Sequence, residues 1–113
     1  MGLLQVEFVG NDLRLSGEID LASAGAFEDA LISAIDTIDG VLECDLRGIT
    51  SFDGSGISAL IAAMASMTKR QRLAVRTSPE VYKLLERAGL SRDVPGLGVE
   101  PPDRERLASS LPR

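Results

Sequence analysis

A polar, glycine-containing segment between a predicted strand and a predicted helix constrains the fold of this chain more than any other feature. In residues 41–46 the apolar residues Leu42, Cys44 and Leu46 recur with a period of two, which is typical of a strand with one buried face. The stripe of a helix is predicted further on by apolar residues at positions i, i+3, i+4 and i+7, namely Ile57, Leu60, Ile61 and Met64. The segment 50–56 between them carries the carboxylate of Asp53 and the hydroxyl of Ser55. Proteins of the α/β class commonly place functional residues in such loops.

Ser55 is the candidate functional residue of this loop, and it lies between Gly54 and Gly56. Because neither glycine has a Cβ, the backbone can adopt a positive φ and another molecule can approach closely. We expect Ser55 at or next to the N-cap, beside first-turn amides that lack intrahelical partners and favour negative charge. Its hydroxyl can therefore be a plain helix cap, which is the commonest use of such a serine, a nucleophile or a phosphorylation site.

The first part of the chain predicts a β-hairpin followed by a helix. Apolar side chains alternate on both sides of a turn at Gly10-Asn11-Asp12, so the hairpin has one solvent-exposed face. An acidic corner at Gly17-Glu18-Ile19-Asp20 follows, and Asp20 can cap the next helix. The apolar stripe of that helix contains Ala26 or Phe27, Ala30, Leu31, Ala34 and Ile38.

The last part of the chain predicts a short strand at 73–75 and a helix with clear ends. Ser78-Pro79-Glu80 gives this helix an N-cap serine, a proline at its first position and an acid in its first turn, and Gly89 follows its last turn. One weak strand is expected within 94–99. A short helix is expected within 104–110, before a frayed tail.

These elements follow the order β-β-α-β-α-β-α-β-α, which predicts an α/β fold formed by one domain over residues 1–113. Its sheet should be mixed, mostly parallel after the hairpin, with the helices packed on it through right-handed crossovers. Loops that leave the carboxyl ends of parallel strands meet at one edge of a sheet. We therefore expect Asp20, Asp53, Ser55 and the start of the Ile57 helix to share one surface.

Composition restricts the function further. The net charge of −5 argues against nucleic acid or an anionic membrane as the main partner, and the basic run Lys69-Arg70-Gln71-Arg72 is interpreted as the end of a helix. The chain has no histidine, which excludes Ser-His-Asp and Cys-His catalysis and most zinc sites, and it has no phosphate-binding P-loop motif. A serine hydrolase or transferase and a nucleotide-binding module are therefore weak alternatives, and we expect no enzyme, no cofactor and no metal.

The single cysteine, Cys44, is expected to be an inert core thiol. The N-terminus has no basic segment followed by an apolar one, so no secretory signal is predicted. No apolar run is long enough to span a bilayer. These features predict a cytoplasmic protein.

Three motifs stand in order along the chain: Gly17-Glu18-Ile19-Asp20, then Cys44-Asp45-Leu46-Arg47-Gly48-Ile49-Thr50-Ser51-Phe52-Asp53-Gly54-Ser55-Gly56-Ile57, then the segment 78–90. Over residues 4–92 the chain resembles the STAS domain family, and within it the bacterial anti-sigma factor antagonists (anti-anti-sigma factors). The central motif is similar to the strand, Asp-Ser-Ser-Gly loop and helix of that family.

The resemblance implies a partner-switching role in the regulation of transcription. The unmodified domain would bind an anti-sigma factor and so free a sigma factor. The anti-sigma factor, itself an ATP-dependent serine kinase, would phosphorylate Ser55 and dissociate, and a phosphatase would reset the domain. The expected partner surface consists of Asp20, Asp53, Gly54, Ser55, Gly56, Ile57 and Ser58.

Gly54 departs from the family pattern, because the family usually has serine or threonine at this position. The phosphoacceptor position itself is kept by Ser55. The departure leaves open a second reading, in which the domain is an unphosphorylated docking subunit of a transport or sensory complex.

Overall fold

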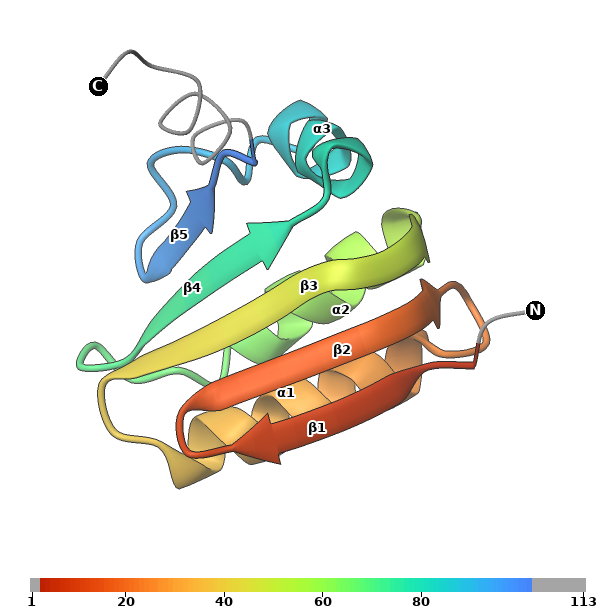
Figure 1. Cartoon of the computed structure of the whole chain (residues 1–113). Coiled ribbons are helices and arrows are strands. Elements are labelled where there is room, and N and C mark those ends of the chain that lie inside the picture. Colours follow the sequence, from red (N-terminus) through yellow and green to blue (C-terminus); the bar gives the residue numbers. More distant parts are fainter. Residues whose placement is uncertain (1–2, 103–113) are drawn as a thin grey trace, which may run out of the picture.

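The computed structural model of the chain describes residues 3–102, which form a five-stranded mixed sheet with helices packed against it (Figure 1). The elements in chain order are β1 (Gln5–Val9), β2 (Asp12–Ile19), α1 (Ala24–Thr37), β3 (Val41–Phe52), α2 (Gly54–Met64), β4 (Arg72–Thr77), α3 (Pro79–Arg87) and β5 (Leu97–Glu100). The strands lie in the sheet in their sequence order, with β1 antiparallel to β2 and all other neighbours parallel. The predicted fold class is confirmed. The helix expected within 104–110 lies outside the described residues.

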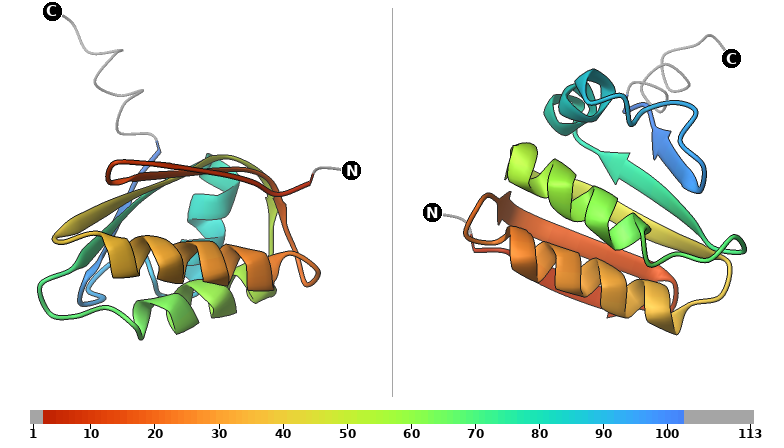
Figure 2. Two further views of the ribbon diagram at one scale, coloured as in Figure 1. Left: turned by 90° about the horizontal axis from the view of Figure 1, so that it is seen from below. Right: turned by 180° about the vertical axis from the view of Figure 1, so that it is seen from behind.

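Helices α1 and α2 lie side by side and cover one face of the sheet, whereas α3 follows the carboxyl end of β4 (Figure 2). The core lies between the two helices and the sheet. It is formed by strand residues with one alternating buried face, by the α1 stripe and by part of α2; its largest fully buried side chains include Leu13, Phe27, Leu31, Leu42, Leu46, Leu60 and Leu73. Cys44 is buried in the same layer, as predicted, and burial together with the nearby Asp45 carboxylate raises the pKa of its thiol to about 12.

The stripe predicted for α2 is wrong in part. The side of α2 that is buried consists of Gly56, Ala59, Leu60 and Ala63. Of the predicted stripe only Leu60 is fully buried, and Ile61 is 51% exposed. The physical reason is close packing: small residues on the inner side let the helix backbone approach α1 and the sheet, and the larger side chains are displaced to its flanks and outer side.

Strand β3 continues well beyond the predicted 41–46 and ends at Phe52. Its pairing with β2 shifts register twice, once between Arg14 and Ser16 of β2 and once between Gly17 and Glu18 of β2. At each shift β3 contains one extra residue, as in a β-bulge, so the apolar period changes from two to three beyond Leu46. This irregular period explains why the segment resembles a loop in the sequence.

Helix α3 agrees with its sequence signals. The hydroxyl of Ser78 accepts a hydrogen bond from the Val81 amide at 3.4 Å, Pro79 is the first helical residue, and Gly89 has a φ of 79°. The interpretation of the basic run 69–72 as the end of a helix is wrong. Helix α2 ends at Met64, and the run lies in the following loop and at the start of β4. Among residues 3–102 no helix combines the length and apolar character required to cross a membrane.

Candidate functional site

The two acidic corners expected to meet are adjacent in the structure. Ile19 at the end of β2 and Phe52 at the end of β3 are register partners in neighbouring parallel strands. Asp20 and Asp53 therefore leave the same edge of the sheet from strands that are separated by the usual spacing of about 4.8 Å. Figure 1 shows both strand ends on the same side, next to the start of α2. The topology thus brings Asp20, Asp53 and Ser55 to one edge.

Asp53 organises the start of α2. Its backbone is extended (φ −132°, ψ −168°), its carboxylate accepts a hydrogen bond from the Ser55 amide at 2.9 Å, and its carbonyl accepts from the Gly56 and Ile57 amides. These bonds satisfy amides that have no partner within the helix. Asp53 is therefore the N-cap of α2, and Ser55 is the second helical residue rather than the cap or its neighbour.

Ser55 is half-buried in the first turn of α2. Within residues 3–102 its hydroxyl forms no hydrogen bond, although its amide is bound to Asp53. The neighbouring Gly54 and Ser58 are exposed, and Ile57 is half-buried. A capping role for the Ser55 side chain is thus not observed, because the Asp53 carboxylate occupies that role.

Gly54 and Gly56, which flank Ser55, have different environments. A Cβ on Gly54 would meet nothing within 4 Å, so a serine or threonine would fit there without a clash. A Cβ on Gly56 would lie 2.7 Å from the Phe52 ring, and Gly56 itself is buried. Gly56 is one of the residues expected at the partner surface; in the structure it is buried, and it permits the close approach of the helix to Phe52.

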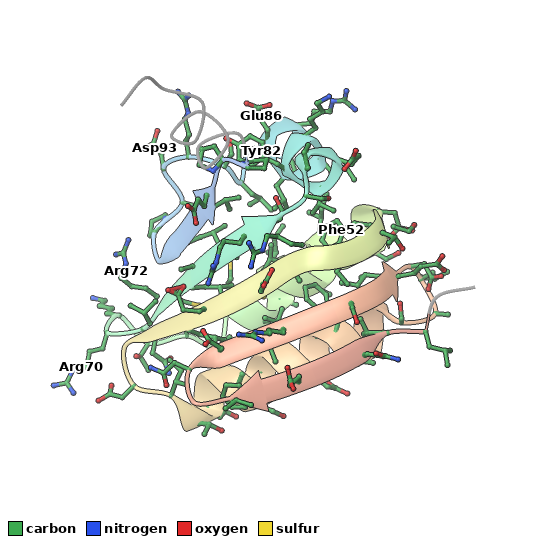
Figure 3. All side chains as sticks on the ribbon, viewed as in Figure 1. Phe52, Arg70, Arg72, Tyr82, Glu86 and Asp93 are labelled. Carbon is green, nitrogen blue, oxygen red and sulfur yellow. The ribbon has the colours of Figure 1, made fainter. Side chains whose placement is uncertain are left out.

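Phe52 supports the loop from below. It lies at the carboxyl end of β3 (Figure 3), is 7% exposed, and packs edge-on against Phe27 of α1 with ring centroids 6.1 Å apart. Edge-to-face pairs of this kind stabilise by about 0.5–1.5 kcal/mol beyond the apolar area that they bury. This contact joins the start of α2 to the rigid core, so the position of Ser55 is fixed by packing as well as by the Asp53 cap. Sequence reasoning missed it, because the spacing of the two rings along the chain carries no signal.

Asp20 closes the turn that precedes α1. Its carboxylate accepts hydrogen bonds from the amides of Ala22 and Ser23 at 3.0 and 3.1 Å. The predicted capping of α1 is wrong in detail, because the helix begins at Ala24 and its N-cap residue is Ser23. The turn presents Leu21 at its tip with 83% of the side chain exposed.

Two apolar residues on elements that flank Ser55 were not predicted as site residues. Leu21 follows Asp20 in the turn, and Ile61 lies on the outer side of α2. Helix α2 also has no charged residue from Gly54 to Met64, which is unusual for a helix with an exposed side. We name the surface formed by Asp20, Leu21, Asp53, Gly54, Ser55, Ile57, Ser58 and Ile61 the helix-start surface. A surface that combines exposed apolar residues with acidic ones is compatible with a protein–protein interface.

Comparisons with known proteins place this geometry in a family. The family model described as "Mlab, STAS domain" matches residues 4–99. Among solved structures, an anti-sigma factor antagonist from Mycobacterium paratuberculosis has a TM-score of 0.71 and 22% sequence identity, over 96% of this chain and 92% of that one. The anti-sigma factor antagonist SpoIIAA in its unphosphorylated form has a TM-score of 0.62 and 20% identity, over 97% of this chain and 100% of that one.

No curated protein matches the chain. At these identities the two solved structures show a shared fold, and the family model covers most of the sequence. The resemblance drawn from the three motifs is confirmed: the chain belongs to the STAS domain family.

Proposed function

We propose that this chain is an anti-sigma factor antagonist whose partner binding is controlled at Ser55. In the unphosphorylated state it binds a cognate anti-sigma factor with serine kinase activity through the helix-start surface, and a sigma factor is released. Phosphorylation of Ser55 ends the interaction, and a phosphatase restores it. The observation that carries the proposal is the Ser55 hydroxyl, which is unbonded within the described residues in the first turn of a helix, at the sheet edge that also carries two acidic corners.

The local electrostatics indicate why a phosphate would act on the interface and not on the fold. A phosphoserine carries about −1.5 to −2 charges at neutral pH. The helix N-terminus would favour these charges by roughly 0.3–1 kcal/mol, and by ~2 kcal/mol in good geometry. The Asp53 carboxylate, bonded to the Ser55 amide, opposes them: at ~5 Å and an effective dielectric constant near 20, each like-charge pair costs about 3 kcal/mol before screening by salt. The domain alone therefore offers the phosphate no net stabilisation.

A docked partner would increase this cost. The exposed residues Leu21 and Ile61 would lose water on binding, and a dianion at Ser55 within the same interface would have to lose water as well. A loss of about 4 kcal/mol of binding free energy corresponds to a roughly thousandfold weaker complex, which is sufficient for a switch. The switch thus requires no refolding, only a change of charge at a desolvated contact.

Titration calorimetry against the cognate anti-sigma factor tests the proposal with Ser55→Ala and Ser55→Asp. We expect Ser55→Ala to bind like the wild type and Ser55→Asp to bind at least about a hundredfold more weakly. Ser33→Asp adds the same charge at an exposed position in the middle of α1 and should bind normally. Equal affinities of the Ala and Asp variants at position 55 would refute the mechanism.

Gly54 favours one second candidate, the unphosphorylated docking subunit of a transport or sensory complex. The position usually occupied by serine or threonine in the resembled motif is here a glycine with open space around it. Incubation with the cognate kinase and ATP separates the two functions, since only the switch gains about 80 Da on Ser55. A Gly54→Ser variant, which fits without a clash, shows whether the missing hydroxyl limits recognition by the kinase.

A further inference from the structure

Strand β3 has an open edge along its last residues. It pairs with β4 from Val41 to Leu46 only, where Leu46 is the register partner of Thr77. Beyond that pair β4 ends and the chain continues into α3, whereas β3 continues beside β2 to Phe52. Figure 1 shows the two strands diverging at this point. In the part of the chain that the structure describes, no strand pairs with residues 47–52 on the β4 side.

A groove of about 530 Å³ lies along this edge. It is bounded on one side by β3 and on the other by α3, and its lining includes Ile49, Ser51 and Phe52 of β3 and Glu80, Val81 and Leu84 of α3. We name it the β3–α3 groove. Ile49, Phe52 and Val81 are buried apolar residues, and Leu84 is half-buried. The groove thus combines an apolar base with the unpaired backbone of a strand.

The edge is not protected in the way that proteins usually protect an open strand. Open edges are commonly shielded by charged residues, by proline or by a covering element, because unpaired amides and carbonyls attract other strands. From Gly48 to Phe52 the edge has neither a charge nor a proline, and Ile49, Thr50 and Phe52 are good strand formers. Arg47, at the start of the edge, is bonded to Asp45.

We propose that the β3–α3 groove binds an extended peptide segment of a protein partner, which adds to β3 as a strand. A groove between a strand edge and a helix provides main-chain hydrogen bonds on one side and side-chain contacts on the other, as in known cases of strand addition. The apolar base selects a segment with apolar residues at alternate positions. Glu80 lies exposed at the rim and adds a negative charge, so a segment that also carries a basic residue is the best complement. The proposal is independent of the function of Ser55, which does not line the groove.

A phage-displayed library of random linear decapeptides is a suitable probe, followed by the synthetic form of the most enriched sequence. We expect enriched peptides with alternating apolar residues. In NMR titrations of the 15N-labelled protein, the amides of 48–52 and of α3 should shift, and the amides of the β3 edge should become protected from hydrogen exchange. Shifts confined to α2, or no enrichment at all, would overturn the proposal.

Matched variants locate the peptide. Leu84→Trp fills the groove and should weaken binding by about tenfold or more, whereas Glu86→Trp, on the side of α3 away from β3 (Figure 3), should leave it within about twofold. Ser51→Trp repeats the test from the exposed strand side if Leu84→Trp lowers the thermal stability. Ser55→Asp should bind the peptide with unchanged affinity, so a failure of the proposed switch and a failure of the groove are distinguished.

Two other occupants would also overturn the proposal. If the edge amides exchange slowly in the full chain and rapidly in a chain truncated after Pro102, the occupant is the chain's own segment 103–113. If their protection depends on protein concentration without any peptide, the occupant is a second copy.

Discussion

Gly56 offers the most direct test of the geometry that holds Ser55. In Gly56→Ala the new Cβ would lie 2.7 and 2.8 Å from two carbons of the Phe52 ring and 3.0 Å from a third. These distances are shorter than normal carbon contacts, so either the ring or the helix start must move. The ring has little freedom, because Phe52 is 7% exposed and packs edge-on against the fully buried Phe27.

The magnitude follows from a comparison with Gly54→Ala, two residues earlier in the same turn. Alanine is preferred over glycine in helices by up to about 1 kcal/mol, and this gain largely cancels between the two variants. At Gly54 the new Cβ meets nothing within 4 Å, whereas at Gly56 overpacking costs typically about 1–3 kcal/mol. We therefore expect Gly56→Ala to be less stable than Gly54→Ala by about 1–3 kcal/mol, or by roughly 4 °C in Tm for each kcal/mol.

Urea denaturation followed by circular dichroism, with thermal scans in parallel, measures this difference. The m-value should be unchanged, because the same surface is exposed on unfolding. Gly54→Ala should be neutral or slightly stabilising. Equal stability of the two variants would show that the contact with Phe52 does not require a glycine, and the reasoning about how Ser55 is positioned would fail.

Three further predictions concern the body of the domain. Thr77 is 3% exposed, and its hydroxyl is the one buried side-chain oxygen or nitrogen among residues 3–102 without a hydrogen bond. Thr77→Val should raise the free energy of unfolding, measured by urea titration, by about 1–3 kcal/mol, and a lower free energy of unfolding would contradict this. The Cys44 thiol, with a pKa of about 12, should resist a thiol reagent at pH 8 until denaturant is added; rapid labelling of the folded protein would oppose this expectation. The hydrogen bond from the Arg47 guanidinium lowers the pKa of Asp45, and burial partly opposes this shift. The stabilisation by ionised Asp45 is therefore present above the unfolded pKa of about 3.9 and is lost as the pH falls through the lower folded pKa. Asp45→Asn should lose stability less steeply than the wild type as the pH is lowered, and a steeper loss would disprove this.

Those elements with signals in adjacent residues were predictable from the sequence. Helix α3 is the clearest case: Ser78, Pro79 and Gly89 fix its two ends through local backbone chemistry that does not depend on the rest of the fold. The meeting of Asp20 and Asp53 was predictable for a similar reason, since the order of strands and helices determines which loops share an edge.

The remaining features depend on neighbours that are distant in sequence. Ile61 fits the period of a buried stripe, yet the close approach of α2 to the sheet buries Ala59 and Ala63 instead. The N-cap residue of α2 could not be identified from the sequence for a similar reason. Asp53, Ser55 and both glycines around Ser55 are all acceptable at a helix start, and the extended conformation of Asp53 selects the first of them.

The end of β4 accounts for both proposed surfaces. Pro79 has no amide proton for a sheet, and Ser78 caps α3, so β4 must end at Thr77. No such stop occurs in β3, which follows β2 through two bulges as far as Phe52. This extension places the Asp53 loop beside Asp20, where the helix-start surface forms.

The same extension leaves residues 47–52 paired on one side only and facing α3. A β3 that ended with β4 would have no open edge. The position of the proposed phosphorylation site and the presence of the β3–α3 groove therefore have one structural cause. A partner that contacts Ser55 lies within reach of the groove, because Phe52 belongs to the groove lining and immediately precedes Asp53. One protein could thus place a folded surface on the helix start and an extended segment along β3, and the affinities of the two contacts would combine through the high effective concentration of the second.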